Sequence, residues 1–189
     1  YAIVENNDGK GGIKYDESPV RYAMVEIYKD ENGGVQAKTT YMNTDCTPTD
    51  KIVFNNSYEI VTPDSVTIQG HKRFVDAAGN EMPYKEFTFV LEPVNEMHEE
   101  IDAPAFTATN DRNGNFVFTF DDIDTEGVWY YVLREVAGND STIEYDGSKY
   151  YVRISAVDNG DGTITAEKEI VDAEGNLVDK FTRESKGDF

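Results

Sequence analysis

The chain has 189 residues, of which 39% are hydrophobic, so it is long enough to build a sizeable core. Its formal net charge of −20 comes from acidic residues spread along the whole chain, which argues against nucleic acid as a partner. No apolar run approaches the roughly 20 residues that a membrane-spanning helix needs, and the single cysteine, Cys46, excludes an internal disulfide.

The first elements of the chain repeat elements near its end. Residues 1–28, YAIVENNDGKGGIKYDESPVRYAMVEIY, align without a gap on residues 131–158, YVLREVAGNDSTIEYDGSKYYVRISAVD. In this alignment Glu5 matches Glu135. Self-similarity of this kind is typical of tandem structural units.

The repeat predicts two units, of which the first is incomplete. Residues 1–61 correspond to the C-terminal half of a first unit, residues 62–65 form a linker, and residues 66–189 form a second unit. The opening YAIVEN has the composition of a strand and not of a signal peptide, so we expect the chain to be a piece of a longer protein. Residues 1–61 alone would expose half of a core, so we expect them to pair with another segment or chain.

In the second unit, short segments alternate between apolar and polar residues with a period of two, as β-strands do. The predicted strands lie in SVTIQGHKRF, KEFTFVLEP, NFVFTF, GVWYYVLREV and SKYYVRISAV, and turns rich in Gly and Asn separate them. Nothing in the sequence shows a sustained helical period. The sequence therefore predicts an all-β protein, an immunoglobulin-like antiparallel β-sandwich.

The segment DNGDGTITAE, residues 158–167, has the composition of a calcium loop but not its spacing. In the EF-hand pattern a Gly stands at position 6 and a Glu at position 12. Aligning the pattern on Gly162 puts Val157 at position 1 and Lys168 at position 12, so both key ligands are missing. We therefore expect a β-hairpin turn here, and we expect neither a metal nor any cofactor.

Four polar residues lie on faces of the predicted strands that are otherwise apolar. They are Lys72 in SVTIQGHKRF, Glu135 in GVWYYVLREV, its repeat equivalent Glu5, and Asn56 in KIVFNNSYE. Lys and Glu are rarely buried unless they are paired, and a buried amide needs a hydrogen-bond partner. Each could instead lie near a sheet edge and reach water with its polar end, but the recurrence of the Glu in both units favours a chemical role.

These residue types support one reaction when they are buried together. Burial favours the neutral forms of a Lys amine and a Glu carboxyl, so the amine becomes a nucleophile and the carboxyl can polarise a carboxamide. The amine then attacks the side-chain carbon of an Asn, ammonia leaves, and an amide links the two side chains. Contact between the groups supplies the effective molarity that this slow reaction needs, and it occurs once per molecule.

The chain resembles tandem streptococcal-type pilin isopeptide-linkage domains, which are CnaB-like modules of Gram-positive pilus backbones and surface adhesins. The resemblance is carried by TIQGHKRF with its G-x-K pattern, EFTFVLEP, FDDIDTEGVWYYVLREV and the F-x-N-x-Y pattern of FNNSY. It covers most of residues 64–181 and, as half a domain, residues 1–58. It implies that a first-strand Lys is joined to a last-strand Asn, with a mid-domain Glu as the catalyst.

By this resemblance Lys72 is the reactive amine of the second unit, and Glu135 is its assisting acid. Glu5 and Asn56 are the corresponding acid and acceptor of the first unit. The Lys of the first unit would precede Tyr1, so this unit shows only two members of the set.

The second unit lacks the expected acceptor. Phe181 matches the Phe of FNNSY, which places Arg183 where the Asn is expected. Asp179 lies two residues before Phe181 and could accept the amine as a Lys–Asp amide, whereas Asn176 lies in a turn and is a poorer candidate. We expect that this unit carries no completed bond, because no complete Lys–Glu–Asn set from one unit is present.

The resemblance implies a structural function, namely the stalk of a pilus subunit or surface adhesin that is secreted and displayed on the cell wall of a Gram-positive bacterium. Its partners would be neighbouring domains of the same surface protein or other pilus subunits. An alternative is a binding module whose loops or Tyr-rich faces hold a host ligand or glycan. An enzyme acting on an external substrate is disfavoured, because neither His71 nor His98 stands in a recognisable triad or metal spacing.

Overall fold

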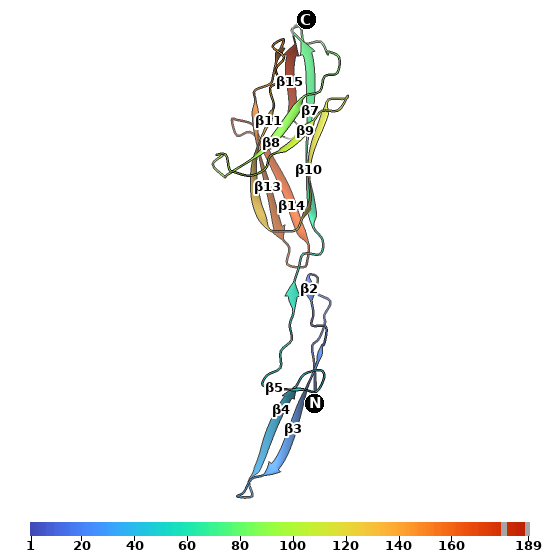
Figure 1. Cartoon of the computed structure of the whole chain (residues 1–189), viewed down its shortest axis with the longest axis vertical. Helices are drawn as coiled ribbons and strands as arrows, with labels where there is room; N and C mark the ends of the chain where they lie inside the picture. Colours follow the sequence, from blue (N-terminus) through green and yellow to red (C-terminus); the bar gives the residue numbers. More distant parts are fainter. Residues whose placement is uncertain (179–180, 188–189) are drawn as a thin grey trace. The chain divides into compact units, whose positions relative to one another are not determined.

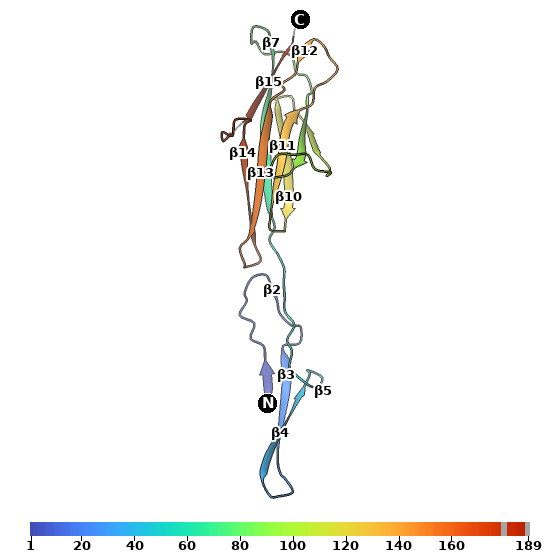
Figure 2. The same cartoon turned by 90° about the vertical axis from the view of Figure 1, so that its left-hand side faces the viewer.

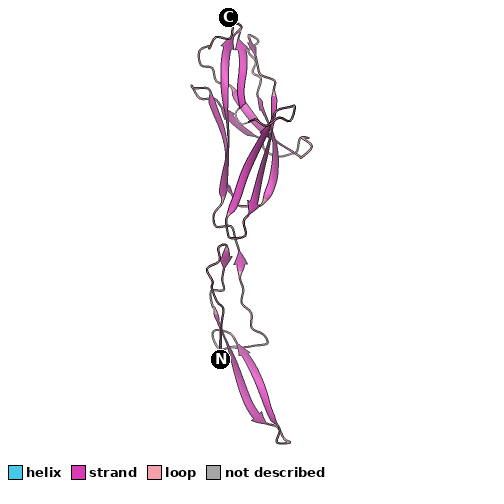
Figure 3. Cartoon of the chain, turned by 180° about the vertical axis from the view of Figure 1, so that it is seen from behind, coloured by secondary structure: helices cyan, strands magenta, loops and turns pink. Residues whose placement is uncertain are grey.

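The computed structural model describes residues 1–178 and 181–187. For residues 181–187 the backbone alone is described. Within the described residues, β-strands are the only regular elements (Figure 3). This confirms the all-β prediction. Within these residues there is no helix with the length and apolar character needed to cross a membrane. The chain divides into two compact units. Unit 1 comprises Tyr1–Val61 with Gly160–Thr163, and unit 2 comprises Thr62–Asn159 with Ile164–Phe189.

Unit 2 consists of two β-sheets (Figure 2). The four-stranded sheet has the order β10–β7–β15–β12, and these strands span Asn115–Ile123, Asp64–Asp76, Phe181–Gly187 and Ile143–Glu144. The five-stranded sheet has the order β14–β13–β11–β8–β9, and its strands span Ile164–Val171, Lys149–Asp158, Gly127–Glu135, Thr88–Val94 and Phe106–Thr109. The five strands predicted from the sequence are all present, as β7, β8, β10, β11 and β13. The sequence did not predict β9, because this strand is too short to show an alternating pattern.

The two sheets of unit 2 enclose one hydrophobic core. Inward-facing side chains of both sheets form it, among them Ile68, Leu133 and Ile154, which are almost fully buried. Phe89 of the five-stranded sheet stacks on Phe116 of the other sheet, with 3.7 Å between the ring centroids. Because a β-sandwich buries the alternate residues of two facing sheets in this way, the predicted fold is confirmed.

The first and last strands of unit 2, β7 and β15, lie side by side and run parallel (Figure 1). Their register pairs Lys72 with Arg183 and Phe74 with Ser185. The other pairings between strands of this unit are antiparallel within the described residues. A parallel pair cannot be joined by a hairpin, and here the connection between the two strands contains most of the unit.

The segment from Asp158 onward forms the expected hairpin turn, which joins β13 to β14. Gly160 and Gly162 have φ angles of 74° and 84°, left-handed values that glycine adopts without steric cost. The Asp161 carboxylate accepts hydrogen bonds from the backbone N–H and the hydroxyl of Thr163, over 3.0 Å and 2.6 Å. The acidic residue therefore acts as a turn-forming residue.

Unit 1 contains one four-stranded sheet and one short strand pair. The sheet has the order β1–β3–β4–β5, with strands at Ala2–Val4, Val20–Lys29, Val35–Met42 and Pro48–Thr49, and β2 (Ile13–Lys14) pairs with β6 (Ser57–Tyr58). Of the hydrophobic residues of this unit, Ala23 alone is buried, whereas Ile27 and Val35 are 66% and 69% exposed. Within the described part of the chain, unit 1 therefore has no hydrophobic core of its own.

Candidate functional site

Lys72 and Glu135 meet inside the core of unit 2. Lys72 lies on β7 of the four-stranded sheet and Glu135 ends β11 of the five-stranded sheet, so the two side chains reach each other across the sandwich. Lys72 Nζ donates a hydrogen bond to Glu135 Oε2 over 2.6 Å. The side chains are 1% and 0% exposed. The period-two alternation of each strand is what turns both residues inward.

The surroundings of this pair are aromatic. Lys72 Nζ lies 4.3 Å from the centroid of the Phe87 ring, and Phe87 contacts Phe74 edge to face with 5.3 Å between the centroids. In a dry, apolar environment either charge alone would cost several kcal/mol, so the amine and the carboxyl stabilise each other. The site therefore holds a shielded amine and a carboxyl within proton-transfer distance.

The position opposite Lys72 on the last strand belongs to Arg183, its partner in the β7–β15 ladder. The same residue stands at the acceptor position in the sequence repeat. Asp179, the substitute acceptor, lies outside the described residues. Asn176 lies in an exposed turn, where its backbone N–H and side-chain Nδ2 donate to the carboxylate of Asp172 over 2.8 Å and 3.0 Å. The side-chain amide of Asn176 therefore stabilises the turn.

Glu5 and Asn56 also meet, in unit 1. Asn56 Nδ2 donates a hydrogen bond to Glu5 Oε1 over 2.6 Å, and Asn56 Oδ1 accepts one from the backbone N–H of Asp16 over 3.1 Å. Both polar atoms of the carboxamide are therefore engaged. Two residues that are 51 positions apart in sequence are brought together at the ends of β1 and β6.

Of the two possibilities for Asn56, a buried face and a position open to water, the structure shows the second. Asn56 is exposed, and of the segment KIVFNNSYE only Ser57 and Tyr58 belong to a ladder, as β6. The inner face of a strand is buried only where a packed layer covers it, and the described residues of unit 1 form no hydrophobic core over this face.

Two residues that the sequence pattern did not assign support the carboxamide of unit 1. The Asp16 carboxylate accepts the backbone N–H groups of Asn55 and Ser18 over 3.0 Å and 2.8 Å, and these hydrogen bonds hold its pKa below the ordinary value. Arg21, which is buried, binds the same carboxylate over 2.8 Å. The sequence repeat could have identified Asp16, because it aligns with Asp146 of unit 2. The Asp146 carboxylate accepts a backbone N–H in the same way.

The two carboxyl groups, Glu5 in unit 1 and Glu135 in unit 2, have different hydrogen-bond partners. In unit 1 an N–H donor contacts the carboxamide oxygen, where negative charge develops when an amine attacks, and a carboxyl contacts the nitrogen that would leave. Among the described residues, Glu5 Oε2 is buried and has no hydrogen-bond partner. In unit 2 the carboxyl contacts an amine instead. The carboxyl is thus paired with a carboxamide in unit 1 and with an amine in unit 2.

A family model described as FctA, the Spy0128-like isopeptide containing domain, matches residues 68–184. No curated protein matches the chain. Among solved structures, a mutant of the major pilin from Streptococcus pyogenes is 17% identical over 67% of this chain and 51% of that chain, with a TM-score of 0.45. The T-13 major pilin of the same species is 18% identical over 67% and 55%, with a TM-score of 0.41. The chain spans about half the length of these structures.

The residues that the family model matches make up more than half of the chain. They include the buried pair Lys72 and Glu135 and the ladder position of Arg183. The chain belongs to the family of Spy0128-like isopeptide-containing domains.

Proposed function

We propose that the chain is a structural module in the stalk of a Gram-positive pilus or surface adhesin, displayed outside the cell beside neighbouring domains or pilus subunits. The observation that carries this proposal is the contact between Lys72 and Glu135 inside the core, in a domain of an isopeptide family. The chemistry proposed is a cross-link that the protein forms in itself once, and no external substrate is turned over.

The proposed cross-link needs an amine, a carboxyl and a carboxamide in contact. The neutral amine attacks the carboxamide carbon of an Asn, and a tetrahedral intermediate forms. The neighbouring Glu carries a proton from the attacking nitrogen to the leaving nitrogen, ammonia departs, and a secondary amide remains between the two side chains. Atoms balance with one ammonia lost for each bond formed.

In unit 2 we assign the amine to Lys72, the acid to Glu135 and the acceptor position to residue 183. The ladder between β7 and β15 supports this assignment, because it places residue 183 opposite Lys72. An arginine has no carboxamide for the amine to attack. The native pair of Lys72 and Glu135 therefore remains an ion pair in this assignment.

In unit 1 we assign the acid to Glu5 and the acceptor to Asn56. The hydrogen bonds of Asn56 support this role, since its oxygen faces a donor and its nitrogen faces the carboxyl. By the repeat, the amine that completes this set belongs to a strand equivalent to β7. The sheet to which such a strand belongs would also cover Met24, whose repeat equivalent Ile154 is almost fully buried in unit 2.

A cross-link between the first and last strands suits a module that carries tension. In unit 2 these strands are neighbours, so a bond between them would close almost the whole unit into one loop. By analogy with disulfides, closing a loop of roughly 100 residues stabilises by about 4–5 kcal/mol in the chain-entropy account. An amide is also resistant to reduction, and the chain contains no cysteine pair that could take its place.

The test is to supply the missing acceptor. The variant Arg183→Asn should lose one ammonia in intact-mass measurements, and peptide mapping should find residues 72 and 183 in one linked fragment. The double variant with Glu135→Ala should retain its full mass, because the proton carrier is gone.

Ser185→Asn is the matched register control. Ser185 is the ladder partner of Phe74, so an Asn there faces no amine in the register of β7 and β15 and should not react. An unchanged mass of folded Arg183→Asn would contradict the assignment of Lys72 and Glu135. Loss of ammonia from Ser185→Asn alone would contradict the assignment of residue 183.

A further inference from the structure

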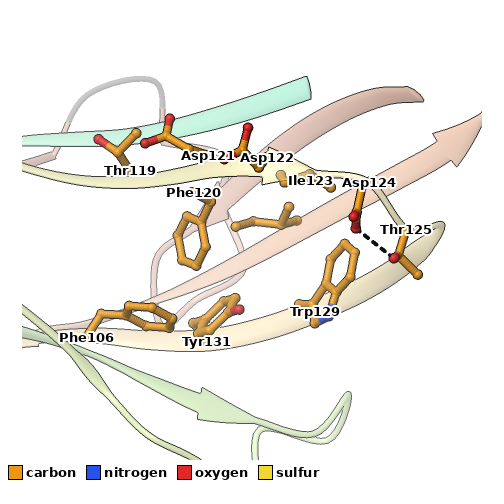
Figure 4. A pocket seen from close by; sticks show the side chains of 11 residues that line it. Phe106, Thr119, Phe120, Asp121, Asp122, Ile123, Asp124, Thr125, Trp129 and Tyr131 are labelled. Atoms are coloured by element: carbon orange, nitrogen blue, oxygen red, sulfur yellow. Dashed lines mark hydrogen bonds between the residues drawn. The ribbon is translucent and has the colours of Figure 1, made fainter. Parts of the chain in front are cut away.

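Unit 2 contains a cavity that plays no part in the proposed cross-link. It has a volume of about 420 Å³, is mostly apolar, and lies between β10, the segment that follows it, and β11 (Figure 4). The side chains that matter for its chemistry are Phe106, Phe120, Ile123, Asp124, Trp129 and Tyr131.

A β-bulge in β10 shapes one wall of this cavity. The ladder with β7 pairs Phe120 with Val66 and then Ile123 with Asp64, so one extra residue is inserted between the two pairs. Asp122 in the bulge has a φ of 55°, a left-handed value that is uncommon outside glycine. As a result both Phe120 and Ile123 point into the cavity, whereas the side chains of Asp121 and Asp122, which also belong to the lining, extend to the other side of the strand (Figure 4). Bulges frequently re-aim side chains beside binding sites.

Aromatic rings form most of the remaining wall. Phe106, Phe120 and Tyr131 contact one another, with centroid distances of 5.0 Å, 5.3 Å and 6.1 Å. Trp129 and Tyr131 lie two residues apart on β11 and therefore share a face of the strand, as Figure 4 shows. The faces of such rings carry negative partial charge and attract cations.

Three aspartates, Asp121, Asp122 and Asp124, are among the lining residues, and Asp124 lies at the end near Trp129 (Figure 4). Asp124 points toward the indole ring, and the hydroxyl of Thr125 donates a hydrogen bond to its Oδ1 over 2.9 Å (Figure 4). No lysine or arginine is among the residues that line the cavity. The chain as a whole has a net charge of −20, which raises the local concentration of cationic ligands.

We propose that this cavity binds the side chain of a lysine presented by a partner protein. The aliphatic stem lies against Phe106, Phe120 and Tyr131, and the ammonium reaches Asp124 beside the indole of Trp129. Charge complementarity selects this occupant, because the site combines aromatic faces with a carboxylate and offers no cation for an acidic ligand.

Trp129 provides a direct readout, because it is the single tryptophan of the chain. The whole native chain is titrated with Nα-acetyl-lysine amide, and the emission of Trp129 is followed. A saturable change is expected. Nα-acetyl-norleucine amide has the same aliphatic stem without the ammonium and should bind at least about threefold more weakly, the size of one partly exposed cation–π or ion-pair contact.

Two variants remove the same unit of charge from different positions. Asp124→Asn should weaken lysine binding at least about threefold. Asp102→Asn is the matched control, because Asp102 is exposed and does not line the cavity. The control should bind within about twofold of the native chain, since a solvent-exposed charge outside the cavity is screened.

Three results would overturn the proposal. The first is the absence of a saturable response to the lysine probe, and the second is equal affinity for the norleucine probe. The third is an equal effect of Asp124→Asn and Asp102→Asn, which would reduce the interaction to general charge attraction. Titration with glucose and galactose is included as well, and a saturable response to either that survives Asp124→Asn would identify a glycan site instead.

Discussion

At the residue scale, the feature that defines this chain is a pair of charged groups in a core that would otherwise be apolar. Lys72 and Glu135 are held 2.6 Å apart between two sheets, next to the ring of Phe87. A hydrophobic pair of similar volume would often stabilise the core at least as well, so the stability of the fold does not require this pair. In unit 1 the equivalent carboxyl, on Glu5, binds Asn56 instead.

We expect Lys72→Ala to lower the free energy of unfolding of unit 2 by about 3–5 kcal/mol, because Glu135 loses its buried cationic partner. Urea unfolding followed by tryptophan fluorescence measures this change. The double variant Lys72→Met with Glu135→Leu should lose less than the single variant, since no charge is left buried.

Arg73→Ala is the control for this prediction. Arg73 neighbours Lys72 in sequence, but its ion pair with Glu81 has side chains that are 39% and 68% exposed. Exposed pairs contribute about 0–1 kcal/mol, so the loss should stay within that range. Equal losses for Lys72→Ala and Arg73→Ala would contradict a stabilising role of the buried pair.

At the element scale, the turn that precedes β10 is fitted closely against β7. Gly114 has a φ of 85°, and its carbonyl accepts the backbone N–H of Lys72 over 2.7 Å. A Cβ at this position would lie 2.4 Å from the carbonyl oxygen of Lys72. A backbone atom cannot move away as a flexible side chain can, so glycine is required here both for its conformation and for its size.

Gly114→Ala should therefore destabilise unit 2 by about 2–4 kcal/mol, of which about 1–2 kcal/mol is the cost of a left-handed alanine. Gly79→Ala separates the two effects, because Gly79 has a φ of 84° but a Cβ there would meet open space. Thermal unfolding of both variants gives the comparison. A loss in Gly114→Ala no larger than that in Gly79→Ala would show that the close approach to β7 costs nothing.

At the scale of the whole molecule, the two units differ in how they are stabilised. The hydrophobic cluster lies entirely in unit 2 and joins its two sheets. Unit 1 buries Ala23 and the Asp16–Arg21 pair, and its strands β3 and β4 keep large apolar side chains exposed. Local stability follows buried apolar contacts, so the two units should open with different free energies.

Hydrogen exchange followed by mass spectrometry tests this difference directly. Amides of β3 and β4 in unit 1 should exchange at least about tenfold faster than those of β11 and β13 in unit 2, because fewer buried contacts oppose opening. The long ladder in each pair provides matched, hydrogen-bonded amides for the comparison. Equal protection in the two hairpins would mean that unit 1 has a source of stability that its described residues do not provide.

The sequence by itself determined the strand pattern, the repeat and the inward direction of Lys72 and Glu135, because side-chain direction along a strand depends only on a local period of two. The repeat also pointed to Glu5 and Asn56 as related positions. Tertiary structure alone decided which groups touch, because contact across a sandwich depends on sheet stacking and strand register. It placed Lys72 on Glu135, put Arg183 opposite Lys72, and left Asn56 exposed in a unit that has no covering core.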